Sequence, residues 1–155
     1  MKANRKRKAE VLLWSIALPG FGQFINGKIL KGIVLIALEF IVNVKGKINE
    51  VIMYSFLGKM EQAIHSADYL WLMFYPCLYL FAIFDAYRDA GGKDEPYSFL
   101  PFVFSAYIGT IGVIYSSTFQ VNGYYIGPVF LSIIGMVLGL LFGQLLKRII
   151  LHAKK

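Results

Sequence analysis

The sequence predicts an all-α membrane protein of one domain, residues 1–155, with a first hairpin broken by glycine and proline, four transmembrane helices and one amphipathic interfacial helix. Apolar residues make up 57% of the 155 residues, whereas charged residues make up 16%. Between residues 99 and 151 the only charged side chains are Lys147 and Arg148. A water-soluble domain of this size would have too little polar surface to cover its core, whereas a bilayer selects long uncharged segments with basic ends.

Basic residues are concentrated at the two ends of the chain. Five of the sixteen Lys and Arg lie in the first eight residues and four lie in the last nine. Such clusters stay on the cytoplasmic side and are attracted to anionic lipid headgroups by about 1 kcal/mol per basic residue. We therefore expect residues 1–10 to form a basic cytoplasmic tail that meets lipid and not nucleic acid, because a nucleic-acid site would need a soluble domain behind it.

The first apolar segment, residues 11–25, is expected to be broken or re-entrant. It is shorter than the roughly 20 residues that cross a bilayer, and Pro19, Gly20 and Gly22 interrupt it. Proline removes a backbone donor and glycine loosens the backbone, so a helix should bend or end here. A full crossing by a short tilted helix is the alternative.

Four further segments are expected to cross the membrane as helices. These predicted spans are residues 29–44, 69–87, 99–117 and 124–146. Residues 48–67 carry apolar side chains every three or four positions, which predicts an amphipathic helix along the membrane surface. Residues 88–97 form a polar loop whose mixed charges indicate a solvated connection.

The charge distribution favours a cytoplasmic location for both termini. If the first segment returns to the side from which it came, Lys28, Lys31, Arg88 and the basic C-terminus lie on the same side as the N-terminus. If this segment crosses fully, the C-terminal basic cluster falls outside. The positive-inside rule therefore favours the re-entrant arrangement.

Small residues recur where helices are expected to pack closely. Gly135, Gly139 and Gly143 lie four residues apart in the last predicted span. Such a face lets two helix backbones approach each other, either within the chain or between two copies in a homo-oligomer. The first hairpin has its own helix-breaking and close-packing residues, which are Pro19, Gly20, Gly22 and Gly27.

Five polar residues are candidates for function or for stabilising the fold: Glu39, Asp85, Arg88, Gln23 and Asn26. Glu39 lies inside a predicted span, where a charge that faces lipid costs at least about 3 kcal/mol. It should therefore face other helices, be neutral or be paired, and its functional alternative is a proton or cation relay with Asp85 or Asn43. Arg88, three residues beyond Asp85, is placed to pair with that carboxylate.

The remaining polar pattern points to folding and not to catalysis. Gln23 and Asn26 can bond to peptide groups that Pro19 and the following turn leave unpaired. The sequence has no phosphate-binding loop and no catalytic-serine or zinc-protease motif, and His65 and His152 are too far apart in sequence to share a metal. We predict no catalytic residue, no metal site and no cofactor.

Three short motifs resemble a known group of proteins. They are Pro19-Gly20-Phe21-Gly22-Gln23, then Asn26-Gly27-Lys28 with Lys31-Gly32, and finally Phe84-Asp85-Ala86-Tyr87-Arg88. This pattern resembles small bacterial polytopic membrane proteins with a PG-x-GQ, NG and KG hairpin and a DAYR-like turn, which are distantly similar to the TM2 domain family. The resemblance covers residues 11–44 and 68–92 and implies a glycine-kinked helical hairpin, without implying an activity.

Two functions follow as expectations. The first is a non-enzymatic accessory or assembly component that acts through helix packing, with another membrane protein or a second copy of the chain as its partner. The alternative is a small ion or solute transporter that uses the broken first helix and Glu39. A lipid-modifying enzyme is a weaker third interpretation, because groups that could serve together as acid, base and nucleophile are scarce.

Overall fold

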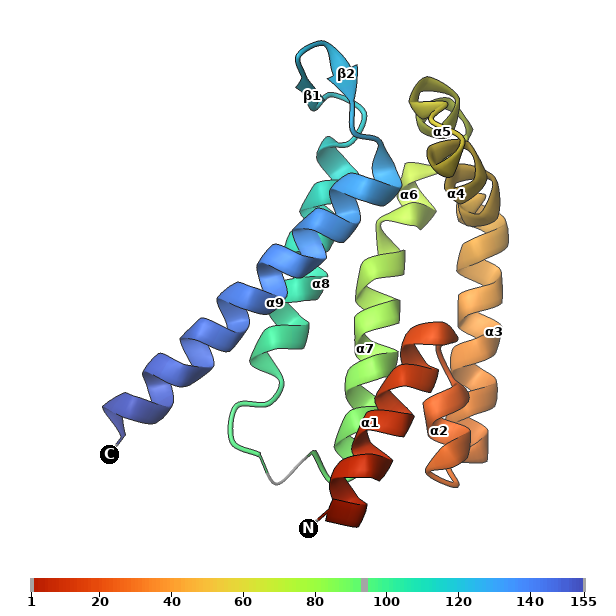
Figure 1. The fold of residues 1–155 in the computed structure, drawn as a ribbon. Helices are drawn as coiled ribbons and strands as arrows, with labels where there is room; N and C mark the ends of the chain where they lie inside the picture. The colour runs from red at the N-terminus through yellow and green to blue at the C-terminus, as the bar shows by residue number, and fades with distance from the viewer. Residues whose placement is uncertain (1, 93–94, 155) are drawn as a thin grey trace.

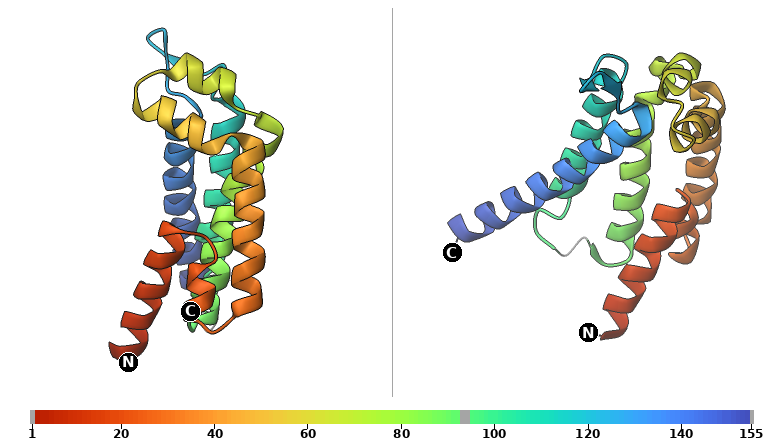
Figure 2. Two further views of the ribbon diagram at one scale, coloured as in Figure 1. Left: turned by 90° about the vertical axis from the view of Figure 1, so that its right-hand side faces the viewer. Right: turned by 45° about the horizontal axis from the view of Figure 1, so that its top comes forward.

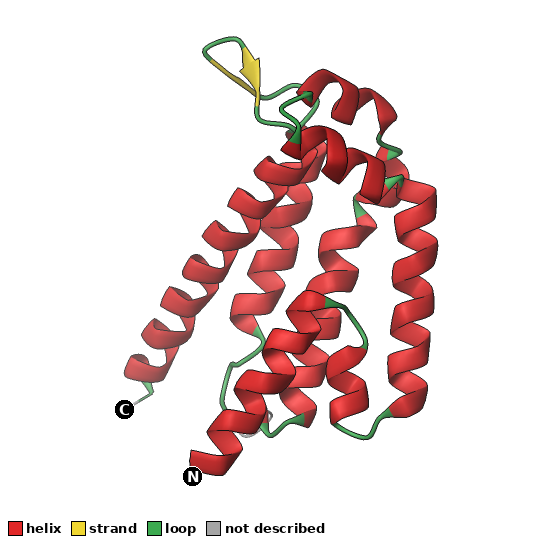
Figure 3. Ribbon diagram, turned by 45° about the vertical axis from the view of Figure 1, so that its right-hand side comes forward, coloured by secondary structure: helices red, strands yellow, loops and turns green. Residues whose placement is uncertain are grey.

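The fold is all-α apart from one short β-hairpin, as Figure 3 shows. The computed structural model describes residues 2–92 and 95–154. The elements in chain order are α1 Lys2–Ala17, α2 Phe21–Ile25, α3 Ile29–Gly46, α4 Ile48–Phe56, α5 Met60–Ser66, α6 Tyr69–Leu72, α7 Phe74–Asp89, α8 Leu100–Tyr115, β1 Gln120–Val121, β2 Tyr124–Tyr125 and α9 Pro128–Ala153. The predicted all-α class is confirmed.

The helices form a bundle with two distinct ends. Both termini lie at one end, and α4, α5 and the β-hairpin lie at the other (Figure 1). Helices α3, α7, α8 and α9 run between these ends, while α4 and α5 lie across the far end of the bundle (Figure 2). Helix α1 starts at the end that holds the termini and stops partway, and α2 runs back toward that end (Figure 1). The N-terminal half therefore contains the reversal that a re-entrant segment requires.

Two helical segments among the described residues are long and apolar enough to cross a membrane. One is Tyr69–Asp89, which joins α6 and α7, and the other is Pro128–Ala153, which is α9. Helix α8 is apolar but shorter. Helix α3 carries Lys31, Glu39 and Lys45, which lower its apolar character. Crossings by α3 and α8 therefore stay predictions.

Helix boundaries differ from the predictions in the amphipathic segment and in the last span. The expected single helix over 48–67 is two helices, because the chain turns at Gly58 with φ of +73°. The last helix begins at Pro128 and not at 124, since Tyr124 belongs to β2. It also continues past 146 to Ala153, because Lys147 and Arg148 are compatible with a helix that leaves the membrane core.

The predicted span 69–87 is interrupted near its start and extended at its end. Helix α6 ends at Leu72 and α7 begins at Phe74. Pro76 explains the interruption, because its ring clashes with the carbonyl four residues earlier, at Leu72. Helix α7 then continues to Asp89, into the predicted polar loop 88–97. Lys93 and Asp94 of that loop lie outside the described residues.

The predicted basic tail, residues 1–10, is part of helix α1, which begins at Lys2. Apolar residues continue directly behind the basic ones, so one helix includes both. The cytoplasmic location of these basic residues stays a prediction.

Helices α8 and α9 pack through the glycine face of α9. A Cβ atom added to Gly135 would lie 2.5 Å from the Ile108 carbonyl oxygen, and one added to Gly143 would lie 2.6 Å from the Leu100 carbonyl oxygen. Gly139 faces the Phe104 carbonyl in the same way. Close backbone approach is what small residues at this spacing permit. The glycine face is therefore occupied within the chain.

Candidate functional site

The break between α1 and α2 is built by Pro19 and Gly20. Gly20 has φ of +101°, a conformation that side chains with a Cβ rarely adopt. A Cβ at this position would also lie 2.6 Å from Ile36 Cγ1 and 2.8 Å from the Gly32 carbonyl oxygen of α3. Gly27, with φ of +71°, makes the next turn, which leads into α3. Glycine is therefore required here by conformation at both turns and by space at Gly20.

Two buried amides then hold this hairpin against α7. The Gln23 side chain is fully buried, and its Nε2 donates to the Ala82 carbonyl at 2.9 Å and to Asp85 Oδ2 at 3.2 Å. Asn26 Nδ2 donates to the Ala86 carbonyl at 2.8 Å. These amides were expected to bond to peptide groups at the break, but they bond to α7 about 60 residues away. The small side chains of Ala82 and Ala86 leave those carbonyls accessible.

Asp85 is the centre of an ion-pair network at this junction. Lys31 Nζ lies 2.8 Å from Asp85 Oδ1, and Arg88 Nη2 lies 2.9 Å from the same oxygen, as its spacing along the helix predicted. Lys31 also pairs with Asp89 at 3.0 Å. The Asp85 side chain is 5% exposed, whereas those of Lys31 and Arg88 are about half exposed. A carboxylate with so many partners stabilises the junction and is poorly placed to act as a free acid or base.

We call Gln23, Asn26, Lys31, Asp85 and Arg88 the polar junction. It unites the three motifs that carry the resemblance noted above, since Gln23 and Asn26 come from the first hairpin and Asp85 and Arg88 from α7. Lys31 was expected to mark orientation and belongs to one of the motifs, but no partner was predicted for it, and Asp89 was not a candidate. Lys31 lies 54 and 58 residues before Asp85 and Asp89, so local spacing gave no signal for these ion pairs.

Glu95 forms a second ionic contact, between α1, α7 and α9. Its carboxylate accepts from Tyr87 Oη at 2.7 Å and from Lys8 Nζ at 3.0 Å, and Lys147 Nζ lies 3.6 Å away. The Tyr87 hydroxyl, together with the two lysines, holds the pKa of Glu95 below its ordinary value, although partial burial opposes the shift. The polar loop was expected to be a solvated connection, and Glu95, which is 43% exposed, in addition links three helices.

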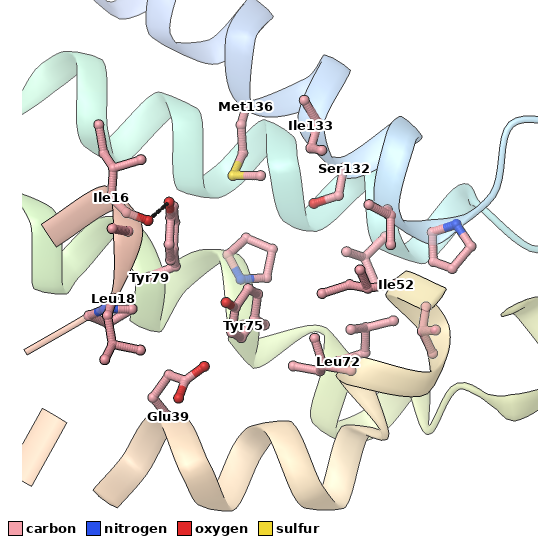
Figure 4. Close-up of a pocket in the computed structure, with 18 residues that line it drawn as sticks. Ile16, Leu18, Glu39, Ile52, Leu72, Tyr75, Tyr79, Ser132, Ile133 and Met136 are labelled. Carbon is pink, nitrogen blue, oxygen red and sulfur yellow. Dashed lines mark hydrogen bonds between the residues drawn. The ribbon is translucent and has the colours of Figure 1, made fainter. Parts of the chain in front are cut away.

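An apolar cavity of about 290 Å³ lies between α1, α3, α4, α6, α7, α8 and α9. Figure 4 shows Glu39 pointing into it from α3, with Tyr75 and Tyr79 from α7 opposite. Ile16 and Leu18 enter from the end of α1, and Ile133 enters from α9. Among the residues that line the cavity, Glu39 is the one with a charged side chain.

The cavity brings together two features that the sequence had marked separately. Pro19, at the break of the first helix, and Glu39 both line it. The C-terminal end of α1 carries partial negative charge on its last carbonyls. Tyr79 Oη donates to one of them, the Ile16 carbonyl, at 2.7 Å. Within the described residues, no hydrogen bond or ion pair involves the Glu39 carboxylate.

The expected relay partners of Glu39 lie elsewhere. Asp85 is bound by Lys31, which precedes Glu39 by eight residues, or about 12 Å along the helix. Asn43 Nδ2 donates to Asn49 Oδ1 at 3.2 Å. A direct relay from Glu39 to Asp85 or Asn43 is therefore not formed in this arrangement.

Comparisons with models of known protein families, with curated proteins and with solved structures found no match for this chain. The resemblance to TM2-like membrane proteins is therefore still an expectation from three motifs. In the part of the chain that the structure describes, no group of three or more His, Cys, Asp or Glu side chains could hold a metal ion.

Proposed function

We propose that the chain is a non-enzymatic, multi-pass carrier of a small solute, which binds in the cavity around Glu39. The observation that carries this proposal is the meeting of the broken end of α1 with the Glu39 carboxylate in one apolar cavity. Broken helices and buried carboxylates mark solute and ion sites in membrane transporters, because exposed helix ends and charges can replace water around a polar group. This corresponds to the transporter alternative stated from the sequence.

The proposed topology places both termini in the cytoplasm and lets α3, α6–α7, α8 and α9 cross the membrane. It is supported by the basic residues near both chain ends and by the position of these ends at one side of the molecule (Figure 1). Helix α3 has 18 residues and α8 has 16, so at 1.5 Å per residue they extend about 27 and 24 Å, which is close to the thickness of a hydrocarbon core.

Assembly through helix packing, the other function expected from the sequence, has less support from the geometry. It was motivated by small-residue faces, an amphipathic surface helix and the lack of catalytic groups, and the glycine face of α9 packs against α8. The outer side of α9 exposes large apolar residues such as Leu138 and Leu141, which lipid would cover in a bilayer. A solute site therefore accounts for the cavity and Glu39, which assembly with another membrane protein or a second copy does not explain.

Binding can be tested with three probes that share a six-carbon chain: hexyltrimethylammonium, hexanol and hexanesulfonate. Each is added to the purified protein in lipid nanodiscs, and the unfolding temperature is compared between wild type and Ile133→Trp, which fills the cavity. A ligand that binds only the folded state raises this temperature. We expect at least one probe to stabilise wild type and to lose that effect in Ile133→Trp.

The matched control is Ile134→Trp, because Ile134 is similarly exposed but does not line the cavity. This variant should keep the effect of the probe. Transport is then measured as uptake into proteoliposomes of whichever charged probe binds. If no probe stabilises wild type more than Ile133→Trp, the binding proposal is wrong, and if a bound probe shows no uptake above empty liposomes, the carrier proposal is wrong.

A further inference from the structure

We infer that the solute is a hydrophobic organic cation, an amine or quaternary ammonium with an apolar body, whose charge pairs with Glu39. The inference rests on the proposed function and names the class of ligand. The cavity is lined almost wholly by apolar side chains, and its one charged group is the Glu39 carboxylate. Electrostatic complementarity therefore selects a positive charge on the ligand.

The position of Glu39 along α3 requires a partner for its charge. Glu39 lies ten residues after the first residue of the helix and seven before its last, so it is about 15 and 10 Å from the two ends. The basic residue Lys31 of the same helix is engaged by Asp85 and Asp89. A carboxylate at this depth is stable when it is neutral or when a cation accompanies it. A bound organic cation supplies that charge.

The end of α1 and two tyrosine rings favour a cation at this position. The C-terminal end of α1 lines the cavity through Ile16, Ala17 and Leu18 and carries partial negative charge, although the Ile16 carbonyl already accepts from Tyr79 Oη and the Leu18 carbonyl from the Phe21 N–H. Tyr75 and Tyr79 stack with their ring centroids 5.7 Å apart and stand opposite Glu39 in Figure 4. Aromatic faces attract ammonium groups, most strongly where water is excluded. The N-terminal end of α9 also reaches the cavity, through Pro128 and Val129, and its partial positive charge opposes this preference, although Pro128 itself has no N–H to offer an anion.

The other side chains that line the cavity favour an organic cation over a calcium or magnesium ion. A calcium ion takes six to eight oxygen ligands and magnesium takes six, whereas the side chains around the cavity offer the Glu39 carboxylate and a few hydroxyls. Aliphatic side chains such as Ile52 and Ile133 form the rest of the wall. These side chains suit an alkyl or aryl group of modest size, because about 290 Å³ is at the lower end of the volumes of ligand cavities.

A lipid with an amine headgroup does not fit this position. The headgroup of a bilayer lipid stays at the membrane surface, whereas Glu39 lies deep along α3. The cation must therefore be small enough to lie wholly within the cavity. A quaternary ammonium with a six-carbon chain, such as hexyltrimethylammonium, meets these requirements and, unlike a simple amine, cannot lose its charge.

The test compares the three probes already named, using wild type, Glu39→Gln and the control Glu61→Gln, in nanodiscs of neutral lipid. Glu61 is exposed on α5 and lies outside the cavity, so its change removes the same charge elsewhere. We expect wild type to bind hexyltrimethylammonium at least tenfold more tightly than hexanol or hexanesulfonate. Glu39→Gln should lose at least tenfold in affinity for the cation, and Glu61→Gln should keep wild-type affinity.

The results of this test distinguish an error in the ligand class from an error in the proposed solute site. If hexanol or hexanesulfonate binds in the cavity as tightly as the cation, or if Glu39→Gln binds the cation like wild type, the ligand class is wrong while the solute site stands. If no probe binds, both are wrong. Should Glu39→Gln fail to fold, the preference of wild type among the three probes decides the ligand class, and Glu39→Asp, which keeps the charge, should retain that preference.

Discussion

At the scale of single residues, two acidic side chains of the helices, Asp85 and Glu39, differ in their partners. Asp85 binds Gln23, Lys31 and Arg88, so its charge is neutralised at the junction of the first hairpin with α7. Glu39 has no such partners among the described residues and faces an apolar cavity. Two acidic residues that look alike in the sequence therefore have different roles, one in holding helices together and one in the proposed site.

The sequence predicted part of this division. The pairing of Asp85 with Arg88 followed from their spacing on one helix, since residues three apart share a face. The contacts of Asp85 with Gln23 and Lys31 join segments that are 62 and 54 residues apart, and helix periodicity carries no information about them. The three motifs of the resemblance identified the right residues without showing that they meet.

Acid should release the contact that Glu95 makes between α1, α7 and α9. The pKa of Glu95 is lowered in the folded protein, first by the Tyr87 hydroxyl and then by Lys8 and Lys147. A group whose folded pKa is depressed contributes stability above its unfolded value, about 4.3, and loses it as the pH falls through the folded value. We expect the unfolding temperature of wild type to fall between pH 5 and pH 3 more than that of Glu95→Gln.

The size of this pH effect should be small, because Glu95 is 43% exposed and solvent weakens its ion pairs. The measurement is a series of thermal unfolding curves in nanodiscs from pH 7 to pH 3, with Glu61→Gln as the control for loss of one exposed carboxylate. Equal slopes for wild type and Glu95→Gln over that interval would contradict the assignment.

At the scale of elements, the short connections were harder to predict than the helices. The segment 48–67 has helical periodicity throughout, which hid the turn at Gly58. The β-hairpin has a clear local signal, since Asn122 and Gly123 both adopt positive φ and Asn-Gly favours two-residue hairpin turns. The predicted last span, 124–146, took in the second strand alone, because Tyr124 and Tyr125 continue the apolar run. Residues 118–123 lie between two predicted spans, so apolar composition misplaced the start of the last helix and not the turn.

Replacing Gly135 with Ala should weaken the packing of α8 on α9. The added Cβ would lie 2.5 Å from the Ile108 carbonyl oxygen, which is backbone and cannot move away as a side chain could. Overpacking of this kind costs about 1–3 kcal/mol. Unfolding of the purified protein in mixed micelles with increasing SDS measures the change, and Leu138→Ala on the outer side of α9 is the control that introduces the same residue.

The same variant separates the two interpretations of the glycine face. If the face packed between two copies of the chain, Gly135→Ala would shift the monomer–dimer equilibrium and leave the stability of the monomer unchanged. Packing within the chain predicts the opposite, namely a less stable monomer with the same oligomeric state by sedimentation in detergent.

At the scale of the whole molecule, the reversal at Pro19 and Gly20 has two consequences. It returns the chain to the end that holds both termini, where the connection between α2 and α3 lies (Figure 1). It also leaves the end of α1 partway along the bundle, where it lines the cavity with Glu39. The sequence predicted the reversal from helix-breaking residues, whereas the cavity depends on how seven helices meet and could not be predicted from any one of them.

The proposed topology makes a direct prediction about accessibility. Single cysteines are introduced as Lys28→Cys, Lys59→Cys and Val121→Cys in a Cys77→Ser background, because Cys77 is an exposed free thiol. All three positions are exposed in the folded chain, so differences in labelling report the side of the membrane and not burial. In intact cells, an impermeant maleimide should label positions 59 and 121 and should leave position 28 unlabelled until the membrane is permeabilised. If α1 and α2 instead formed a full crossing, position 28 would react from outside and positions 59 and 121 would be protected, because each later span would then run in the opposite direction.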